Sequence, residues 1–431
     1  MSTQEYTIAT ARIAGKKVPI VIVPGIMGSR LTDPATQSLV WNPFGWPNPV
    51  GDEPGIFAAN KARLRRVDQP LVPDETNKYA QVADRVRVDP INHYYNLLSK
   101  YYGDLAISLH YDLRQDLASR QLVPAVYCAG YDWRQSNDQS AQRLSTIVDE
   151  ARADCDNEPV ILVAHSMGGI VSRHYCKNLG GESKVKALFL LGSPTLGAVT
   201  AYMSMRLGLS FFDAVRRILN MNRTDTKAFM RSMPSAYELL PTYIYCSQVR
   251  TSWATFDPNH TGFRDQLNPG GVGDDLMYNL AFRISDNSNS VLFYNDIYVG
   301  QRDEPASRDA VSNQLTAAYG FHNGLSVGTS SVYMHPHTVA YYCDTLDTFG
   351  DISMQYDGVV VRPTNDIVVS ANVNGSKTAG GDGTVPADSA NPSAVSTPFT
   401  DTRNFPGVEH TALTASSDVI RALRTAIVGL V

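Results

Sequence analysis

The sequence lacks any hydrophobic segment long enough to cross a membrane. Its longest apolar run, residues 18–27, is interrupted by Pro24 and Gly25 and is far too short to span a bilayer. The N-terminal stretch MSTQEYTIATARIAGKK contains no continuous apolar segment of the kind that a secretory signal carries. We therefore expect no transmembrane segment and no signal peptide in this sequence.

Clusters of basic residues are missing as well. Lysine and arginine total 37 against 42 aspartate and glutamate residues, which gives a net charge of -5. This balance, without a polybasic run, argues against a nucleic-acid partner and against electrostatic attraction to anionic lipid. Any contact with a membrane surface would have to be peripheral and apolar. The 18% of charged and 43% of hydrophobic residues are typical of a globular protein.

Cysteine is scarce and has no pattern. The five cysteines are an odd number and do not have the spacing of a metal site. Four of them lie in apolar or strand-like contexts, so we interpret those as small core residues. The five are Cys128, Cys155, Cys176, Cys246 and Cys343.

Strand-like and helix-like segments alternate between residues 18 and 194. This alternation is typical of an α/β protein with a doubly wound, mostly parallel sheet. A chain of 431 residues is long for one domain, so we expect sizeable insertions in this core. The predicted strands cover residues 18–23, 122–127, 160–164 and 185–191. The predicted helices cover residues 94–102, 105–121 and 139–153.

Residues 159–173, PVILVAHSMGGIVSR, have the pattern of a strand, a tight turn and a helix, with Ser166 at the turn. This arrangement is the nucleophile elbow of serine hydrolases, in which small residues near the serine prevent collisions between the strand and the helix. Ala164 takes the first position of the G-x-S-x-G pattern, and Gly168 and Gly169 follow the serine. The alternative is a buried strand–helix turn with an incidental serine. Ser166 is the candidate nucleophile.

An acid and a base are needed to activate such a serine. Histidine suits the base because its pKa lies near 7, and a buried carboxylate can hold its tautomer. Asp382 lies in the glycine-flanked loop AGGDGTVP, and His410 follows it just before a predicted helix at 412–428. The order Ser, Asp, His is the one expected of an α/β-hydrolase. Asp388 and Asp401 are the alternatives for the acid, and an ordinary loop histidine is the alternative interpretation of His410.

The loop PGIMGSRL at residues 24–31 follows the first predicted strand. An α/β-hydrolase takes one oxyanion-hole amide from such an early loop and the other from the residue after the nucleophile, here Met167. Backbone N–H groups are needed because the tetrahedral intermediate carries charge that fixed donors stabilise by about 3 kcal/mol each. A simple strand-to-loop turn is the alternative interpretation of residues 24–31.

Two long segments interrupt the core pattern. Residues 33–90 are rich in Pro, Asn, Asp and Gly and predict an irregular insertion near the site. Residues 198–218, rich in methionine and aromatics, predict a helix that packs as a cap and also lines an acyl pocket. The GYDWR segment at 130–134 is interpreted as a structural ion pair of Asp132 with Arg134 around an aromatic wedge.

Six segments together resemble the lecithin:cholesterol acyltransferase family, which includes lysosomal phospholipase A2 and phospholipid:diacylglycerol acyltransferases. Each segment is weak alone, but their common order across most of the chain is specific. They are PGIMGSRL (24–31), GYDWR (130–134), AHSMGG (164–169), PSAYELLPT (234–242), GDGTVP (381–386) and VEH (408–410).

The resemblance implies an α/β-hydrolase core with cap insertions. Carried over by motif, Ser166 is the nucleophile, Asp382 the acid and His410 the base, with the amides of Ile26 and Met167 as the oxyanion hole. Family members need no metal, so we expect no cofactor. The implied division is a first core part at 1–194, a cap or lid at 195–330, and the rest of the core, with acid and base, at 331–431.

The function implied is that of a lipolytic serine hydrolase or acyltransferase of the lipase or phospholipase type, acting on a lipid or other hydrophobic ester. A carboxylesterase for a non-lipid ester and a non-catalytic binding protein on a hydrolase scaffold are the alternatives. The mammalian members have a disulfide-closed lid in the early insertion, but no cysteine lies between residues 1 and 127 here. This difference favours a bacterial member, and its compartment stays open between the cytoplasm and export.

Overall fold

A computed structural model describes the chain in nine stretches. They are residues 15–42, 62–75, 79–82, 85–88, 96–208, 222–242, 308–361, 367–376 and 379–431. Six strands form one sheet in the order β17-β12-β9-β8-β1-β7, and every pairing between neighbouring strands of this sheet is parallel. The strands are β1 (Lys16–Val23), β7 (Leu122–Cys128), β8 (Val160–His165), β9 (Val185–Leu191), β12 (Thr338–Tyr342) and β17 (Asp401–Asn404).

The four strands predicted from apolar runs are present, each within two residues of its expected bounds. In β8, for example, every residue is buried, because alternate side chains of the apolar run pack on the two covered faces of the sheet. In the sheet, β1 lies between β7 on one side and β8 on the other, so the strand order changes direction at β1. Such a change of direction opens a crevice at the carboxyl ends of the two central strands, which is where open α/β sheets hold their sites.

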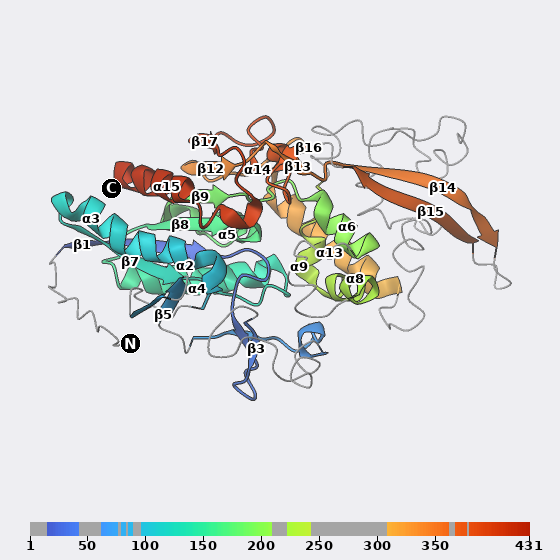
Figure 1. Ribbon diagram of the computed structural model, residues 1–431, viewed down its shortest axis with the longest axis horizontal. Helices are drawn as coiled ribbons and strands as arrows, with labels where there is room; N and C mark the ends of the chain where they lie inside the picture. The colour runs from blue at the N-terminus through green and yellow to red at the C-terminus, as the bar shows by residue number, and fades with distance from the viewer. Residues whose placement is uncertain are drawn as a thin grey trace.

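Helices cover both faces of the sheet, so the core has three layers (Figure 1). On one face lie α4 (Asn137–Ala153) and α5 (Met167–Asn178), which pack on residues such as Val21, Leu162 and Leu188. The opposite face carries helices that pack on Ile20, Ile161 and Phe189. Those helices are α2 (Ser99–Ile107), α3 (Leu113–Leu117) and α15 (Ser417–Leu430), with the π-helical segment Ser108–Asp112 joining α2 to α3. The predicted α/β-hydrolase-type sheet is confirmed.

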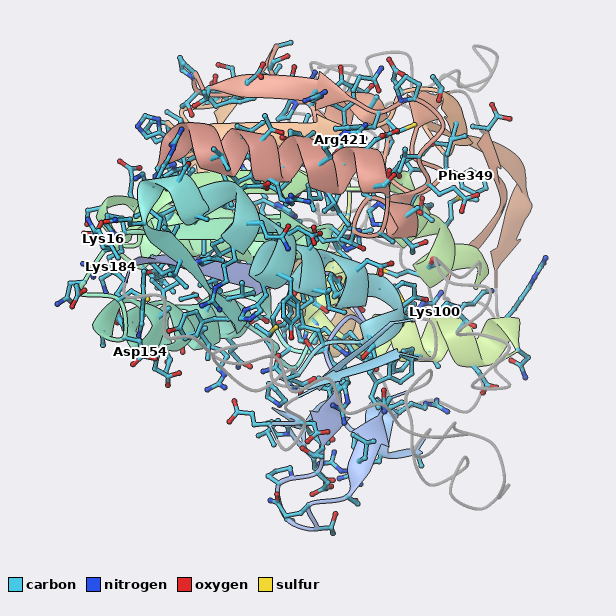
Figure 2. The ribbon with its side chains drawn as sticks, turned by 60° about the vertical axis from the view of Figure 1, so that its left-hand side comes forward. Lys16, Lys100, Asp154, Lys184, Phe349 and Arg421 are labelled. Atoms are coloured by element: carbon cyan, nitrogen blue, oxygen red, sulfur yellow. The ribbon has the colours of Figure 1, made fainter. Side chains whose placement is uncertain are left out.

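Several charged residues lie near the amino-terminal ends of the sheet strands. Lys16, Asp154 and Lys184 lie on the same side of the molecule, and Phe349 lies on the other side (Figure 2). Lys16 pairs with Glu158 at 2.6 Å, with its side chain 58% exposed. Because exposed ion pairs contribute about 0–1 kcal/mol each, this pair adds little to the stability of the fold.

Residues 192–337 separate two strands that are neighbours in the sheet, β9 and β12. The described part of this segment is mostly helical and ends in the two short strands Ser326–Val327 and Ser331–Val332. It contains α6 (Val199–Leu207), α8 (Arg223–Ser232), α9 (Pro234–Tyr237) and α13 (Arg308–Leu325). The helix predicted over 198–218 is shorter than expected, because Gly208 adopts a left-handed conformation (φ 68°) and ends α6. Residues 209–218 of that prediction lie outside the described residues.

The remaining strands are short or lie outside the main sheet. Residues 33–90, expected to be irregular, contain several of them, because short extended segments pair there in antiparallel fashion. The long β14–β15 ribbon projects from the body of the molecule (Figure 1). These strands are β2 (Leu31–Thr32), β3 (Leu39–Trp41), β4 (Val72–Pro73), β5 (Tyr79–Val82), β6 (Arg85–Val88), β10 (Ser326–Val327), β11 (Ser331–Val332), β13 (Leu346–Thr348), β14 (Asp351–Val361), β15 (Ile367–Ser376) and β16 (Ala379–Gly381).

The structural interpretation of the GYDWR segment is confirmed. Arg134 donates from Nε and Nη2 to the two carboxylate oxygens of Asp132, at 2.8 and 2.7 Å, and its side chain is fully buried. Trp133 packs edge-on against Trp41 with ring centroids 5.4 Å apart. The cysteines described, Cys128, Cys155, Cys176 and Cys343, are free and buried, as expected for small core residues, and Cys246 lies outside the described residues. Within the described stretches, no helix is long and apolar enough to cross a bilayer.

Candidate active site

Ser166 lies at the sharp turn between β8 and α5, as the elbow pattern predicts. Its backbone has φ 54° and ψ -128°, a conformation that a non-glycine residue rarely adopts and that costs about 1–3 kcal/mol. Two bonds hold the turn: Ser166 N–H donates to the carbonyl of Leu191 at 2.9 Å, and Ser193 Oγ donates to the carbonyl of Ser166 at 2.9 Å. The strain is therefore maintained by neighbouring strand ends.

The small residues of the elbow are required by close backbone contacts. A Cβ atom on Gly168 would lie 2.5 Å from the carbonyl oxygens of both Val23 and Pro24, so α5 passes directly against the end of β1. A Cβ atom on Gly25 would lie 2.7 Å from the Cβ atom of Ser166. The loop after β1 and the serine turn can approach each other only because these positions are glycine.

Ser166, His410 and Asp382 are brought together in a continuous hydrogen-bonded chain. His410 Nε2 lies 2.8 Å from Ser166 Oγ, and His410 Nδ1 lies 2.7 Å from Asp382 Oδ2. All three residues are buried, with exposed fractions of 6%, 3% and 2% for the serine, histidine and aspartate. Asp382 and His410 lie 216 and 244 positions after Ser166 in the sequence, so the contact is made entirely by the fold.

Asp382 is held at its other carboxylate oxygen by the loop itself. Oδ1 accepts from the backbone N–H groups of Thr384 at 3.0 Å and Val385 at 2.7 Å. Gly383 has φ 86°, which lets the chain reverse so that these two amides face the carboxylate. The backbone N–H of His410 donates to the carbonyl of Asp382 at 2.9 Å, which fixes the acid loop against the histidine segment. One carboxylate oxygen of Asp382 therefore accepts hydrogen bonds from the loop, and the other lies against Nδ1 of the base.

Asp382, and neither of the alternative acids Asp388 and Asp401, lies against His410 Nδ1, and two other histidines have different partners. Asp401 is exposed on β17, and Asp388 lies in the short helix α14 (Ala387–Ala390). His174 lies on α5 and contacts Asp138 through Nε2 at 2.8 Å. His335 Nδ1 accepts from the backbone of His337 at 3.1 Å, in a turn before β12.

The candidate oxyanion residues belong to the two segments that meet at the serine. Met167 is the first residue of α5, and first-turn amides of a helix have no intrahelical acceptor. Ile26 is buried and follows Gly25 at the carboxyl end of β1. Gly28 N–H donates to the carbonyl of Gly25 at 3.0 Å, so the loop folds into a tight turn around Ile26. Their role as oxyanion donors stays a prediction.

Two residues near the base were not found by sequence reasoning. Tyr102, on α2, lies with its hydroxyl 2.9 Å from His165 Nδ1, and His165 Nε2 lies 3.0 Å from the carbonyl oxygen of His410. The side chain of His165 therefore contacts Tyr102 and the backbone of His410. Only the position of His165 directly before the serine could have drawn attention to it.

Burial changes the pKa of His165 strongly. Removal from water, and then the neighbouring His410, lower the pKa of His165 from 6.5 to about 3. The unfolded chain therefore binds a proton at this residue below pH 6.5, and the folded chain does not until about pH 3. In this window the free energy of unfolding falls as the pH falls.

We therefore expect His165→Gln to weaken the acid sensitivity of the fold. The free energy of unfolding of the wild type should fall more steeply between about pH 6 and pH 4, by about 1.4 kcal/mol per pH unit, because one proton is excluded from the native state. Urea unfolding at a series of pH values measures this difference. Other buried histidines contribute equally to both proteins, so equal slopes would contradict the prediction.

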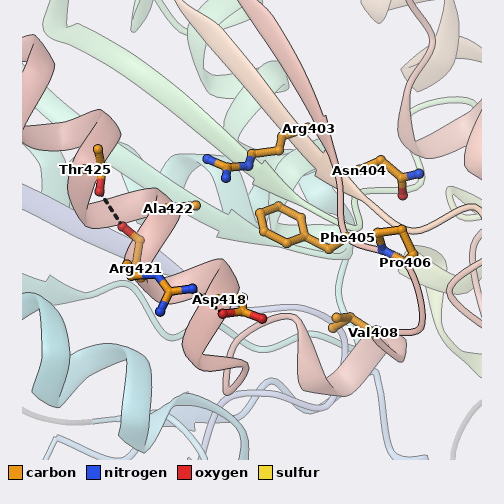
Figure 3. Close-up of a pocket in the computed structure, with 9 residues that line it drawn as sticks. All are labelled: Arg403, Asn404, Phe405, Pro406, Val408, Asp418, Arg421, Ala422 and Thr425. Carbon is orange, nitrogen blue, oxygen red and sulfur yellow. Dashed lines mark hydrogen bonds and ion pairs between the residues drawn. The ribbon is translucent and has the colours of Figure 1, made fainter.

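A surface groove lies beside the segment that leads to His410. It has a volume of about 460 Å³ and is lined by residues of the Arg403–Val408 segment and of α15 (Figure 3). Arg421 pairs with Asp418 on one wall, and the Arg403 guanidinium lies 5.4 Å from the centre of the Phe405 ring. None of the catalytic candidates lines this groove, so it is distinct from the place where an ester would meet Ser166. Within the described residues, no group of three or more His, Cys, Asp or Glu side chains could hold a metal ion.

Comparison with known families gives a match at the serine. The family model for lecithin:cholesterol acyltransferase matches residues 116–266, a range that contains Ser166 and Met167. The resemblance inferred from the six motifs is thereby confirmed over this range. An uncharacterized protein of Saccharomyces cerevisiae is 26% identical over 177 residues, which is 41% of this chain and 23% of that protein. The match thus spans less than a quarter of this curated relative.

A solved structure shares the fold of this chain. A chain of the Tle4–Tli4 complex superposes with a TM-score of 0.63 and 19% identity, covering 96% of this chain and 98% of that one. The lipase BlEst2 of Bacillus licheniformis has 16% identity over 51% of this chain and 58% of its own, but its TM-score is only 0.25. The first similarity therefore extends over nearly the whole length of both chains.

Proposed function

We propose that this serine hydrolase or acyltransferase cleaves a lipid ester through an acyl-enzyme on Ser166. One observation carries the proposal: Ser166, His410 and Asp382 form a buried chain with hydrogen-bond distances of 2.8 and 2.7 Å. A serine, a base within reach and an acid that orients the base are the parts that nucleophilic acyl transfer requires.

In the first half of the reaction, Ser166 Oγ attacks the ester carbonyl carbon while His410 Nε2 accepts the hydroxyl proton. Asp382 Oδ2 accepts from His410 Nδ1 and stabilises the imidazolium that forms. The tetrahedral intermediate then loses its alcohol, which takes the proton from His410 Nε2, and the acyl group stays on Ser166. Water or a second alcohol repeats these steps and releases the acid or a new ester.

The negative charge of the tetrahedral intermediate needs fixed donors. The backbone N–H groups of Ile26 and Met167 are proposed for this role, because both follow strand ends beside the serine. Each donor of this kind is typically worth about 3 kcal/mol in the transition state. The turn that surrounds Ile26 is closed by the bond from Gly28 to Gly25, so little reorganisation is required during the reaction.

A lipid substrate is supported by the family match and by the residues beyond β9. The match to lecithin:cholesterol acyltransferase includes the elbow and the start of the segment at 195–330, which we propose to be a cap or lid. On α6, Tyr202, Met203 and Met205 are buried, and flexible thioether and aromatic side chains accommodate an acyl chain well. On this proposal residues 33–90 are an insertion near the site, residues 331–431 complete the core, and any membrane contact is peripheral.

We expect the specificity constant to rise with acyl chain length. With p-nitrophenyl esters, kcat/KM for palmitate should exceed that for butyrate by about tenfold or more, because each buried methylene contributes about 0.8 kcal/mol. A preference for acetyl or butyryl esters would instead support the carboxylesterase alternative.

The lipid class follows from the products. Mass spectrometry of a reaction containing phospholipid vesicles and a long-chain alcohol reports cleavage position, chain preference and transfer together. Free fatty acid or a new alcohol ester is the expected result. Release of neither from any lipid, by protein that cleaves p-nitrophenyl esters, would overturn the lipid assignment while leaving the serine mechanism intact.

A further inference from the structure

A buried hydrogen-bond chain runs from the loop after β1 to the base, and the proposed mechanism does not use it. Gly25 N–H donates to Tyr102 Oη at 2.8 Å. Tyr102 Oη lies 2.9 Å from His165 Nδ1, and His165 Nε2 lies 3.0 Å from the carbonyl oxygen of His410. Tyr102 is 1% exposed and His165 5% exposed, so water does not compete for these bonds.

The two ends of the chain fix where its protons lie. The His410 carbonyl can only accept, so His165 must carry a proton on Nε2. At the other end, Gly25 N–H can only donate, so Tyr102 Oη accepts there and its own hydroxyl proton is available for His165 Nδ1. The chain therefore has one direction, from Gly25 through Tyr102 and His165 to His410, with a neutral His165.

The hydrogen-bond chain ends at the loop that carries the proposed oxyanion amide and at the backbone of the base. Gly25 is held by Tyr102 at its N–H and by Gly28 at its carbonyl oxygen. Because the Gly25 carbonyl and the Ile26 N–H share one planar peptide unit, fixing Gly25 also fixes the direction of the Ile26 N–H. At the far end, the bond to the His410 carbonyl holds the backbone of the base.

The geometry also makes a neutral His165 important for the reaction. The rings of His165 and His410 have centroids 4.9 Å apart. His410 becomes positively charged when it accepts the serine proton, and a second charge at this distance would oppose it. The groups that face His165 are Tyr102, which donates to its Nδ1, and His410, whose charge in the transition state is balanced by Asp382.

We propose that Tyr102 and His165 are positioning residues, which hold the proposed oxyanion loop and the base in register through this directional chain. The inference rests on the proposed function, because it assigns the chain a role only if His410 acts as the base. Neither residue contacts the reacting atoms, so both act through Gly25 and His410.

Nitrogen NMR of histidine-labelled protein tests the direction of the chain without any activity measurement. The His165 signals, identified by their loss in His165→Gln, should report a neutral ring protonated on Nε2 from about pH 5 to pH 9. A ring protonated on Nδ1 alone, or one that takes up a second proton in this range, would overturn the proposal.

Kinetics test the positioning role. Tyr102→Phe should lower kcat about tenfold with KM unchanged, because the two hydrogen bonds that hold Gly25 and His165 are lost while the substrate contacts remain. His165→Gln, which keeps a donor near the Nε2 position, should retain more of kcat than His165→Leu, and Tyr101→Phe on the same helix is the control. Equal losses in His165→Gln and His165→Leu, or a change confined to KM, would overturn the role. Failure of a fluorophosphonate to label Ser166 in the wild type would instead remove the proposed function itself.

Discussion

Replacing Ser166 with alanine is expected to abolish esterase activity while leaving the fold intact. We expect kcat/KM for p-nitrophenyl esters to fall by about 10⁴-fold or more, because the only atom that can form the acyl-enzyme is removed. Labelling by a fluorophosphonate should also be lost. Hydrolysis of the ester by purified variant and wild type, with enzyme concentration fixed by active-site titration of the wild type, measures the ratio.

The fold should survive because alanine keeps the Cβ atom and the backbone of the turn. The bonds from Ser166 N–H to Leu191 and from Ser193 to the Ser166 carbonyl involve backbone atoms of residue 166 that the substitution retains. Unfolding free energies of the two proteins should agree within about 1 kcal/mol.

Ser172→Ala supplies a matched control for this loss. Ser172 lies farther along α5 and donates to the carbonyl of Gly168 at 2.8 Å, away from His410. Activity close to wild type is expected there. Undiminished hydrolysis by Ser166→Ala, in contrast, would remove Ser166 from the mechanism.

Asp382→Asn should lower kcat by about 10³- to 10⁴-fold near neutral pH, through the tautomer of the base. Two backbone amides, of Thr384 and Val385, donate to Oδ1, so the amide oxygen of an asparagine would take that position. Its NH₂ group would then face His410 Nδ1. Because that nitrogen would have to accept, the His410 proton would move to Nε2, where it would block removal of the serine proton.

The same contacts predict that this variant folds. An asparagine has the shape of aspartate and can keep both bonds to the loop, so only the bond to His410 changes character. Asp401→Asn, at the exposed rival carboxylate, is the control and should keep full activity. A decrease of less than about tenfold in kcat for Asp382→Asn, in a folded protein, would show that Asp382 does not orient the base.

Much of the core could be predicted because its determinants are local. The apolar run of β8 predicts a buried strand, and the glycines at 168 and 169 predict a close helix after the serine. Insertions were harder. Residues 33–90 are rich in turn-forming residues, so the short strands β3–β6 could not be predicted there. Gly208 ends a helix that the apolar pattern predicts to continue.

In the candidate site, too, some residues could be predicted from the sequence and others could not. Asp382 and Ser166 were recognisable because a tight loop around a functional side chain needs glycine on the chain nearby. Tyr102 was not recognisable, since a tyrosine among the apolar residues of α2 is indistinguishable from an ordinary core residue. His165 was recognisable only as a neighbour of the serine.

The sequence by itself determined the strands, the strained serine turn and the chemical groups that can react, because each depends on side chains within a few residues of one another. Only the tertiary structure decided which groups meet. Tyr102 bonds to a residue 63 positions away, and His165 to one 245 positions away. Hydrogen bonds over such separations are set by sheet order and helix packing, and they leave no periodic pattern in the chain. The direction of the buried chain that joins Gly25 to His410 therefore belongs to the fold alone.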